Sequence, residues 1–328
     1  MTNSTSLPED DFDSNTKESP LTCGVPLDKC GCRLDQFAAE MFPQYSRSRL
    51  QQWIREGNLT LDGRTVKPNA KLAGGELISL LAVEREQAAW LAEDIPLNIV
   101  YEDEYLLVIN KPSGLVVHPA AGNYSGTLLN GLLHHNPVHA KLPRAGIVHR
   151  LDKDTTGLMV VAKSEIAQQA LVQQLQARTV KRNYQAIVHG SVRASGFVCA
   201  AIGRHPSVRT KMAVLERGGK EALTHYQIVK DYTDFTHLEL KLETGRTHQI
   251  RVHMAHLGHP LIGDVPYGKK MPEKLLRANP DLSLLAEFPR QALHAYKLGL
   301  IHPISREACQ WQADVPADMQ QLLTLLSA

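Results

Sequence analysis

The chain has 328 residues, of which 43% are hydrophobic and 21% charged, and its formal net charge at pH 7 is +2. That length and hydrophobic content are enough for more than one domain with a sizeable core. No apolar run approaches the roughly 18 residues of a membrane-spanning helix, and the polar, acidic N-terminus lacks the apolar segment of a signal peptide, so we expect a cytoplasmic protein that does not bind membranes.

Residues 1–26 are predicted to form a disordered acidic tail, because they are rich in Ser, Thr, Asp, Asn and Pro and lack aliphatic periodicity. The acidity of the tail leaves a modest basic excess on the rest of the chain, which fits a polyanionic partner. The five cysteines are expected to be reduced thiols, since no export signal precedes them. The spacing of Cys23, Cys30 and Cys32 matches no zinc site, so no metal is expected there.

Residues 27–81 are predicted to form a small domain. Its elements, in chain order, are a helix over 32–42, a second helix over 46–57, a hairpin over 59–66 and a short strand over 74–81. Ser46 is expected to cap the second helix, and Asp62-Gly63 has the composition of a tight hairpin turn.

The second helix of this domain carries Arg47, Arg49 and Arg55. From charge alone a solvated helix face is the favoured interpretation. The segment "RLDQ…SRSRLQQWIREGNLTLDGRTVKP…GGELI" resembles the S4 RNA-binding domain, in which paired short helices present basic residues to RNA. The resemblance implies that these three arginines contact RNA.

Residues 82–97 are predicted to be a linker, and residues 98–328 a second, larger domain. Its predicted elements are a hairpin over 98–112, helices over 126–135, 164–178 and 247–258, and strands over 145–151, 157–163, 183–190, 224–232 and 237–244. Ser164 is expected to cap the second of these helices. The absence of a strict strand–helix alternation favours an α+β domain with a largely antiparallel sheet.

The stretch "HRLDKDTTGLMVVAK", residues 149–163, places charged residues directly before a buried strand. If residues 145–151 and 157–163 are paired strands, Asp152 leaves the first strand in a position fixed by backbone hydrogen bonds, as a catalytic carboxylate requires. Asp152 to Thr156 could equally form a turn in which Asp154 bonds its own backbone. The residues alone favour the turn.

The stretch "KLETGRTHQIRVHMAHLGH", residues 241–259, places Arg251 beside Ile250, Met254 and Leu257, which form the expected buried stripe of a helix. A guanidinium beside the core needs a carboxylate partner, and Asp152 is a candidate. Arg246 precedes the helix. The spacing of the three histidines at positions 253, 256 and 259 drifts around the helix, so a metal site is not expected.

Two further segments combine basic residues with strands. In "RTVKRNYQAIV", Tyr184 shares the inward face of a strand with other apolar residues, either as a core tyrosine or as an aromatic ring on which a flipped base stacks. The basic residues just before it are Arg178, Lys181 and Arg182. In "IGRHPSVRTKMAV", basic residues that include Arg209 and Lys211 interrupt apolar strands, as an RNA-gripping loop would.

Together, "VHRLDKDTTGLMVVAK", "KRNYQAIV", "TGRTHQIRVHMAHLGHPLIGD" and "RQALHA" resemble the RluA-type pseudouridine synthases. With the S4-like domain in front, the resemblance narrows to the D group of that family, which modifies large-subunit ribosomal RNA. It implies a cleft across a central mixed, mainly antiparallel sheet with flanking helices. It also implies an enzyme that acts on this RNA or on the assembling subunit, with no cofactor, no nucleotide cofactor and no metal. A monomer is the default expectation for the chain.

The resemblance also implies roles for residues. Asp152 would be the catalytic carboxylate, Arg251 its partner, and Tyr184 would lie against the uracil, with Arg150 and Ile250 as active-site support. The RNA-binding set would be Arg47, Arg49, Arg55, Arg178, Lys181, Arg182, Arg209, Lys211 and Arg246. The implied targets are loop uridines of helix 69 in 23S ribosomal RNA. The alternatives are an S4-bearing synthase with other targets, a non-catalytic RNA-binding assembly factor, and a metal-dependent hydrolase that uses His253.

Overall fold

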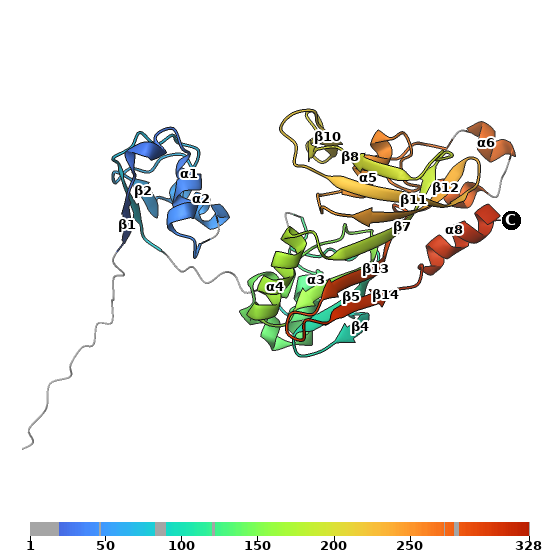
Figure 1. Cartoon of the computed structure of the whole chain (residues 1–328), viewed down its shortest axis with the longest axis horizontal. Coiled ribbons are helices and arrows are strands. Elements are labelled where there is room, and N and C mark those ends of the chain that lie inside the picture. Colours follow the sequence, from blue (N-terminus) through green and yellow to red (C-terminus); the bar gives the residue numbers. More distant parts are fainter. Residues whose placement is uncertain are drawn as a thin grey trace, which may run out of the picture. The chain divides into compact units, whose positions relative to one another are not determined.

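The computed structural model describes residues 20–327, apart from 46, 83–89, 120–121, 272 and 279–281. The chain divides into two compact units, residues 1–89 and 90–328 (Figure 1). Ser46, the expected helix cap, lies outside the described residues, as do residues 1–19 of the predicted tail. No helix among the described residues is long and apolar enough to cross a bilayer.

The first unit packs two helices on a three-stranded antiparallel sheet in the order β1-β3-β2. Its elements are β1 (Leu21–Gly24), η1 (Leu27–Lys29), α1 (Leu34–Met41), α2 (Arg47–Glu56), β2 (Leu59–Leu61) and β3 (Leu77–Leu80). One face of α2 is apolar and buried, since Leu50, Trp53 and Ile54 are at most 4% exposed. Both predicted helices of this unit are therefore present and lie against its core.

Two predictions for this unit were wrong. Residues 21–24, assigned to the tail, form β1, because Cys23 pairs with Ile78 of β3 and packs on the core. A four-residue edge strand is too short to show a clear period of two. The predicted tight turn at Asp62-Gly63 is present, since Leu61 and Arg64 exchange backbone hydrogen bonds of 3.0 and 2.9 Å. The second strand of the hairpin predicted over 59–66 is wrong, because β2 pairs with β3 instead.

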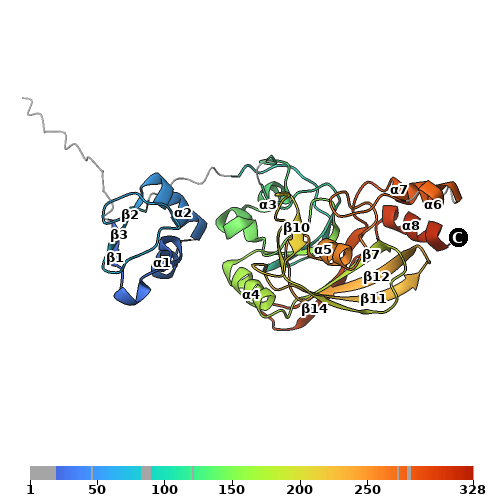
Figure 2. The same cartoon turned by 90° about the horizontal axis from the view of Figure 1, so that it is seen from above.

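The second unit is built around a large sheet with helices on both faces (Figures 1 and 2). Its strands are β4 (Ile99–Glu102), β5 (Leu106–Lys111), β6 (Thr156–Ala162), β7 (Lys181–His189), β8 (Gly196–Cys199), β9 (Ile202–Arg204), β10 (Met212–Val214), β11 (Leu223–Asp231), β12 (Phe235–Leu242), β13 (Leu293–Ile301) and β14 (Ala308–Gln312). Its helices are α3 (Leu128–His135), η2 (Pro137–Lys141), η3 (Pro143–Gly146), α4 (Glu165–Gln176), α5 (Gln249–His256), α6 (Glu273–Ala278), α7 (Ser283–Ala286) and α8 (Ala317–Ser327).

The strand order in this sheet is β4-β5-β6-β13-β7-β12-β11-β8, and β14 pairs with β13 beside that path. Every pairing is antiparallel except the one between β6 and β13, which is parallel. The sheet is therefore mixed and mainly antiparallel, and the predicted α+β class is confirmed. The parallel pair lies at the centre, where a strand from near the C-terminus separates β6 from β7.

The central strands are apolar on both faces because both faces are covered. Met159 and Val161 of β6 pack in a cluster with α3 and with Ile250 of α5, while Leu158 and Val160 pack in another cluster with α4. A strand covered on both sides has a continuous apolar run in place of alternation, which explains the sequence of residues 156–162. The hydroxyl of Ser164 accepts a hydrogen bond from the backbone N–H of Ala167, which confirms the predicted cap of α4.

The strand predicted over residues 145–151 was wrong. The residues before Asp152 form η3 and then an extended segment whose one bridge to β6 joins Ile147 and Val161. Beyond that bridge, the ring Nε2 of His149 accepts the hydrogen bond of the Val160 N–H at 3.1 Å. The Val160 N–H therefore donates to a side chain and not to the backbone carbonyl of a neighbouring strand, so no regular ladder of backbone hydrogen bonds forms.

Part of the predicted linker belongs to the second unit. The Glu93 N–H donates to the Asn130 carbonyl of α3, and the Asn130 side chain donates to the Leu91 carbonyl at 2.8 Å. Residues 90–97 are therefore held on α3. Residues 83–89 lie outside the described residues.

Candidate active site

A cleft of about 650 Å³ opens in the second unit. Its lining comes mainly from the connection from η3 to β6, the end of α4 and the segment after it, the start of β7, and the turn from β12 into α5. The predicted site residues that line it are Arg150, Asp152, Arg178, Arg182, Tyr184, Arg246, Ile250 and Arg251. Segments far apart in the sequence thus converge on one cavity.

Asp152 lies in the loop that leads into β6, and its carboxylate contacts the cleft. The Thr155 N–H donates to the Asp152 carbonyl at 3.1 Å, so residues 152–155 form a turn. Arg251 Nη1 donates to Asp152 Oδ2 at 2.8 Å, and the Asp152 side chain is 19% exposed. The ion pair proposed from the sequence is present, and the turn over 152–155 is closed by a backbone hydrogen bond.

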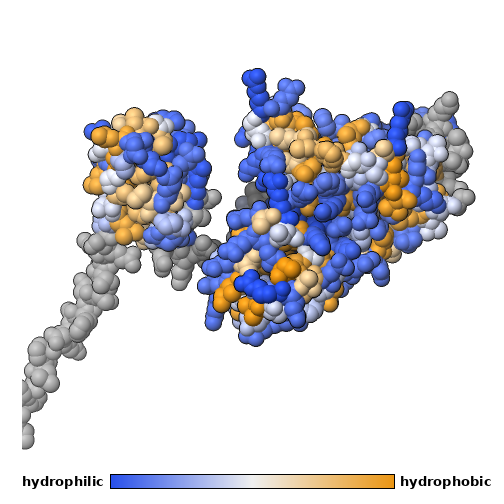
Figure 3. Space-filling model, viewed as in Figure 1, coloured by the Kyte–Doolittle hydropathy of each residue, from blue (hydrophilic) through white to orange (hydrophobic). Residues whose placement is uncertain are grey.

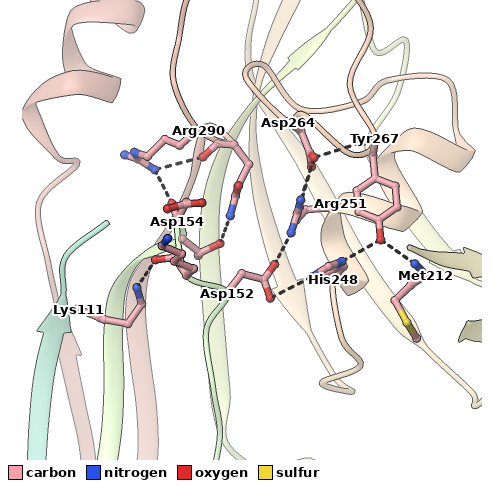
Figure 4. A network of polar contacts seen from close by, with 12 residues as sticks. Lys111, Asp152, Asp154, Met212, His248, Arg251, Asp264, Tyr267 and Arg290 are labelled. Atoms are coloured by element: carbon pink, nitrogen blue, oxygen red, sulfur yellow. Dashed lines mark hydrogen bonds and ion pairs between the residues drawn. The ribbon is translucent and has the colours of Figure 1, made fainter. Parts of the chain in front are cut away.

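Arg251 is held by a second carboxylate that the sequence analysis did not single out. Its Nε and Nη2 donate to the two carboxylate oxygens of Asp264 at 2.7 and 2.9 Å (Figure 4). Burial lowers the pKa of Arg251, but the hydrogen bonds and charges of Asp264 and Asp152 outweigh it and raise the pKa above its usual value. The guanidinium therefore stays charged although only 6% of the side chain is exposed.

Tyr267 and His248 complete this polar network. The Tyr267 hydroxyl accepts a hydrogen bond from the Met212 N–H at 2.8 Å and lies 2.8 Å from His248 Nδ1. On the other side of the ring, His248 Nε2 is 3.9 Å from Asp152 Oδ1. Burial lowers the pKa of His248, with Asp152 opposing the shift, so the ring is neutral at pH 7. Figure 4 shows the Asp152 carboxylate with one oxygen directed at Arg251 and the other at His248.

Two buried cations hold the backbone of the Asp152 loop from the opposite side. Lys111 at the end of β5 donates to three carbonyls, including that of Lys153 at 2.7 Å. Arg290 Nη1 donates to the Asp154 carbonyl at 3.3 Å, while its other nitrogens pair with Asp318. Burial lowers the pKa of Lys111 to about 8. The loop is therefore fixed through its backbone carbonyls, and the Asp152 carboxylate takes no part in holding the loop backbone to Lys111 or Arg290.

Tyr184 and Ile250 form an apolar side of the cleft. Tyr184 is 5% exposed and Ile250 3%, and both belong to the main core cluster of the unit. Burial raises the pKa of the Tyr184 phenol, and the charge of Arg182 opposes the shift. The burial of Ile250 confirms its place in the predicted buried stripe, and both residues lie at the boundary between core and cavity. Leu257, predicted to share the buried stripe of α5, is 38% exposed because the helix ends at His256.

The other basic residues of the second unit differ in their surroundings. Arg178 pairs with Glu221 at 3.0 Å, and Arg246 Nε donates to the Glu221 carbonyl. Lys181 on β7 is exposed and lies outside the cleft lining. Arg209 and Lys211 lie in the loop between β9 and β10 and are likewise not part of the lining.

The three predicted RNA-binding residues of the first unit lie on α2. Arg47 donates two hydrogen bonds to Asp35, and the guanidinium of Arg49 lies 5.1 Å from the centre of the Trp53 ring. Arg55 is exposed in the last turn of the helix.

The histidines of α5 do not form a ligand set. His253 is fully buried, with Nδ1 2.9 Å from the Thr224 hydroxyl and Nε2 3.0 Å from the Ala200 carbonyl. Both ring nitrogens are thus already hydrogen-bonded. In the part of the chain that the structure describes, no three His, Cys, Asp or Glu side chains converge as metal ligands.

Comparison with known proteins matches both units. Residues 105–256 match the model of the RNA pseudouridylate synthase family, and residues 32–78 match the S4 domain. The ribosomal large subunit pseudouridine synthase D of Pseudomonas aeruginosa is 53% identical over 302 residues, 92% of this chain and 94% of that one. The protein of the same name from Escherichia coli K12 is 52% identical over 309 residues, 94% of each chain.

Solved structures agree. The human RNA pseudouridylate synthase domain containing 4 superposes with a TM-score of 0.56 at 26% identity, over 70% of this chain and 93% of that one. The human RNA pseudouridylate synthase domain containing 1 gives a TM-score of 0.52 at 25% identity, over 72% and 97%.

Proposed function

The chain belongs to the RNA pseudouridylate synthase family, and from that membership we propose that it converts uridines of large-subunit ribosomal RNA to pseudouridine, with Asp152 as the catalytic carboxylate. It is an RNA pseudouridine synthase, an isomerase with an N-terminal S4 domain. The choice of large-subunit RNA is supported by two bacterial relatives of that name, which are more than 50% identical over nearly the whole chain.

The observation that carries the proposal is the state of the Asp152 carboxylate. Arg251 holds its Oδ2 at 2.8 Å, whereas its Oδ1 is 3.9 Å from the nearest ring nitrogen, beyond hydrogen-bond distance. An ion pair with a guanidinium exists only for the ionised carboxylate. Asp152 thus presents one charged oxygen that accepts no hydrogen bond from the described residues, with His248 as its neighbour in the cleft.

The reaction requires little beyond such a group. The N1–C1′ bond of uridine breaks, the uracil turns while it is held, C5 joins C1′, and the proton on C5 leaves as N1 gains one. Nothing is oxidised or hydrolysed. Ionised Asp152 acts on the ribose or on the uracil at the bond-breaking step, and the backbone bonds to Lys111 and Arg290 keep it in place while it does so.

Tyr184 and Ile250 would enclose the detached base. The target nucleotide must leave its stack to enter the cleft, at a cost of a few kcal/mol, and a buried aromatic ring recovers part of that cost by stacking. The tyrosine ring and the isoleucine side chain both line the cleft. A base that is held between them is less able to escape before C5 reaches C1′.

The basic residues would bind the RNA backbone. Hydrophilic residues predominate on the face of the second unit seen in Figure 3. The proposed set within and around the cleft is Arg150, Arg178, Lys181, Arg182, Arg209, Lys211 and Arg246, and the S4 domain would add Arg47, Arg49 and Arg55. We place the enzyme in the cytoplasm as a monomer, with helix 69 loop uridines of 23S ribosomal RNA as its targets.

The test is release of tritium from large-subunit RNA labelled at uracil C5. The wild type should release label to water, and Asp152→Asn should bind the RNA and release none. Asp154→Asn, which changes another carboxylate of the same loop, is the matched control and should retain turnover. No release by the wild type from any large-subunit RNA would contradict the function, and equal release from Asp152→Asn would remove Asp152 from the chemistry.

The helix 69 assignment has its own measurement. After reaction, pseudouridines in 23S RNA are located by carbodiimide treatment and reverse transcription, on free RNA and on assembled subunits. Reverse-transcription stops in the helix 69 loop would support the proposed target. Stops at other positions would assign a different target without contradicting the activity.

A further inference from the structure

Arg182 differs from the other basic residues of the cleft because it is buried and has no acidic partner. The residue is 8% exposed, its Nε has no hydrogen-bond partner, and Nη2 makes one long bond of 3.3 Å to the Glu243 carbonyl. Among the described residues, no carboxylate lies within ion-pair distance of it. A buried charge without a partner is costly, so this guanidinium is a candidate for binding an anion from outside the protein.

The neighbouring turn leaves space for the guanidinium. A Cβ at position 245 would lie 2.7 Å from Arg182 Nη1, closer than side-chain carbons approach. Glycine at this position therefore allows Arg182 to lie beside the turn that leads into α5. The same turn and the same arginine line the cleft.

The neutral ring of His149 provides a second hydrogen-bond donor beside Arg182. Its Nε2 accepts the Val160 N–H, so the neutral ring carries its proton on Nδ1. Burial is the main cause that lowers the pKa of His149 to about 3, and the positive charge of Arg182 contributes to the shift. The ring therefore stays neutral and lines the cleft with one N–H to donate.

The strand geometry relates this pair to the proposed uracil site. Arg182 and Tyr184 are two residues apart on β7, so they lie on the same face of the strand, about 6.8 Å apart along it. In a nucleotide the ribose separates the base from its phosphate. A base stacked on Tyr184 would therefore place the adjacent phosphate near Arg182.

We propose that Arg182 and His149 form a binding site for one phosphodiester of the RNA, the one next to the target uridine. This inference rests on the proposed function, since it takes Tyr184 as the base platform. The site would fix the flipped nucleotide by its phosphate while the base turns, because the reaction changes no bond of the phosphate. Arg182 thus has a different task from the exposed basic residues, which bind the backbone without regard to one linkage.

The charge of Arg182 could instead stabilise the uracil when it leaves C1′ with the bonding electrons. The burial of Arg182 is compatible with either task. A chemical change in the RNA distinguishes them. A phosphate contact is lost when that linkage is made uncharged, whereas a base contact is unaffected by the change.

The experiment combines protein and RNA changes in a double-mutant cycle. A stem-loop that the wild type isomerises is synthesised with one methylphosphonate at a time on either side of the target uridine, and the Kd is measured. In the wild type, a methylphosphonate at one of the two linkages should weaken binding about ten- to hundredfold, the range for a hydrogen bond to a charged group. Arg182→Gln should bind the all-phosphate RNA as weakly as the wild type binds the RNA with the methylphosphonate at that linkage. A methylphosphonate at the same linkage should then cause no further loss of affinity in Arg182→Gln.

Two variants serve as controls. Lys181→Gln removes a neighbouring exposed charge and should keep the full penalty at the same linkage. Arg182→Lys keeps the charge but not the forked donors, so it should show a smaller penalty at the same linkage. This variant also provides the test if Arg182→Gln does not fold.

The outcomes are distinct. If the fold-loss in Kd from Arg182→Gln and the fold-loss from the methylphosphonate multiply in the combined experiment, the two changes act independently. That result would overturn the phosphate site and assign Arg182 to the base. An unchanged penalty in Arg182→Lys would overturn it as well. A wild type that isomerises no large-subunit RNA would instead contradict the proposed function itself.

Discussion

Arg251 makes two hydrogen bonds to Asp264 and one to Asp152, so the residue that orients the guanidinium is not the proposed catalytic one. The two-pronged contact uses Nε and Nη2 and fixes the plane of the group. Asp152 receives the remaining Nη1. The orientation of the Asp152 carboxylate therefore depends on a residue that needs no contact with substrate.

We predict that Asp264→Asn lowers kcat about a hundredfold, because a small misplacement of a reacting group can cost that much. It should also lower the free energy of unfolding by about 3–5 kcal/mol, the cost of breaking a buried ion pair. Tritium release and urea unfolding measure the two effects. Asp103→Asn, which changes a hydrogen-bonded carboxylate outside the cleft lining, should affect stability alone. An unchanged kcat in Asp264→Asn would show that Asp152 is oriented by other contacts.

Tyr267→Phe should lower kcat about tenfold, the effect of losing one buried hydrogen bond. The Tyr267 hydroxyl already accepts from the Met212 N–H, so its own proton is available to His248 Nδ1. His248 then carries its proton on Nε2, which faces Asp152. Phenylalanine preserves the ring near Arg251 but frees the histidine to change tautomer.

The matched control for that variant is Tyr101→Phe. Its hydroxyl donates to Asp103 at 2.7 Å, so the control also removes a phenol hydrogen bond, on strand β4 outside the cleft lining. It should leave kcat unchanged. Equal kcat values for the two variants would show that the tautomer of His248 has no influence on turnover.

Lys111 predicts opposite effects of alkaline pH on activity and stability. Burial lowers its pKa to about 8, so above pH 8 the amine has one donor too few for its three carbonyls and kcat should fall. The unfolded chain keeps this proton up to about pH 10.4. Between these values the unfolded state binds more protons, so the contribution of Lys111 to the free energy of unfolding rises with pH.

Lys111→Met isolates that contribution from the other groups that titrate in the same range. The difference in unfolding free energy, wild type minus variant, should increase by about 1.4 kcal/mol per pH unit between pH 8 and 10. Urea unfolding at several pH values measures it. A difference that stays flat or decreases would mean that Lys111 titrates outside this range.

Three histidines that are buried or half-buried predict a loss of stability in acid. Burial is the main cause that lowers the pKa of His149 to about 3 and the pKa values of His118 and His294 to about 4. In the unfolded chain these groups take up a proton near pH 6.5. The unfolded state therefore binds more protons as the pH falls from 6.5 to 4, and stability decreases.

The expected decrease is about 1.4 kcal/mol per pH unit for each histidine within this range. Urea unfolding of the second unit at pH 6.5, 5.5 and 4.5 measures the slope. His294→Gln should reduce it by the share of one histidine. A slope identical to that of the wild type would place the acid sensitivity elsewhere.

The sequence predicted best the elements that local patterns define. Helices α3, α4 and α5 were expected, and the hairpin of β4 and β5 is present. The strand predicted over 145–151 is absent because the His149 side chain accepts the hydrogen bond of the Val160 N–H on β6. Strand β13 was not predicted at all, since its place between β6 and β7 is set by pairings with residues more than a hundred positions earlier.

The same limit applies to the site. Resemblance identified Asp152, Arg251 and Tyr184, and the structure brings all three to one cleft. Asp264 had one usable signal, because it is the first acidic residue after Arg251 in the sequence and a buried guanidinium needs a carboxylate. The contact of Tyr267 with the Met212 backbone had none, because a backbone donor leaves no mark in the sequence.

The place of β13 in the sheet imposes an order on the making of the enzyme. A ribosome releases β4 to β12 before residues 293–301 exist, so during synthesis β6 and β7 lack the strand that joins them. Arg290 and Gln291, which hold the Asp152 loop, emerge with that strand. The nascent chain therefore has no assembled active site until residues 290–301 have left the exit tunnel, and premature termination anywhere before β13 yields an inert fragment.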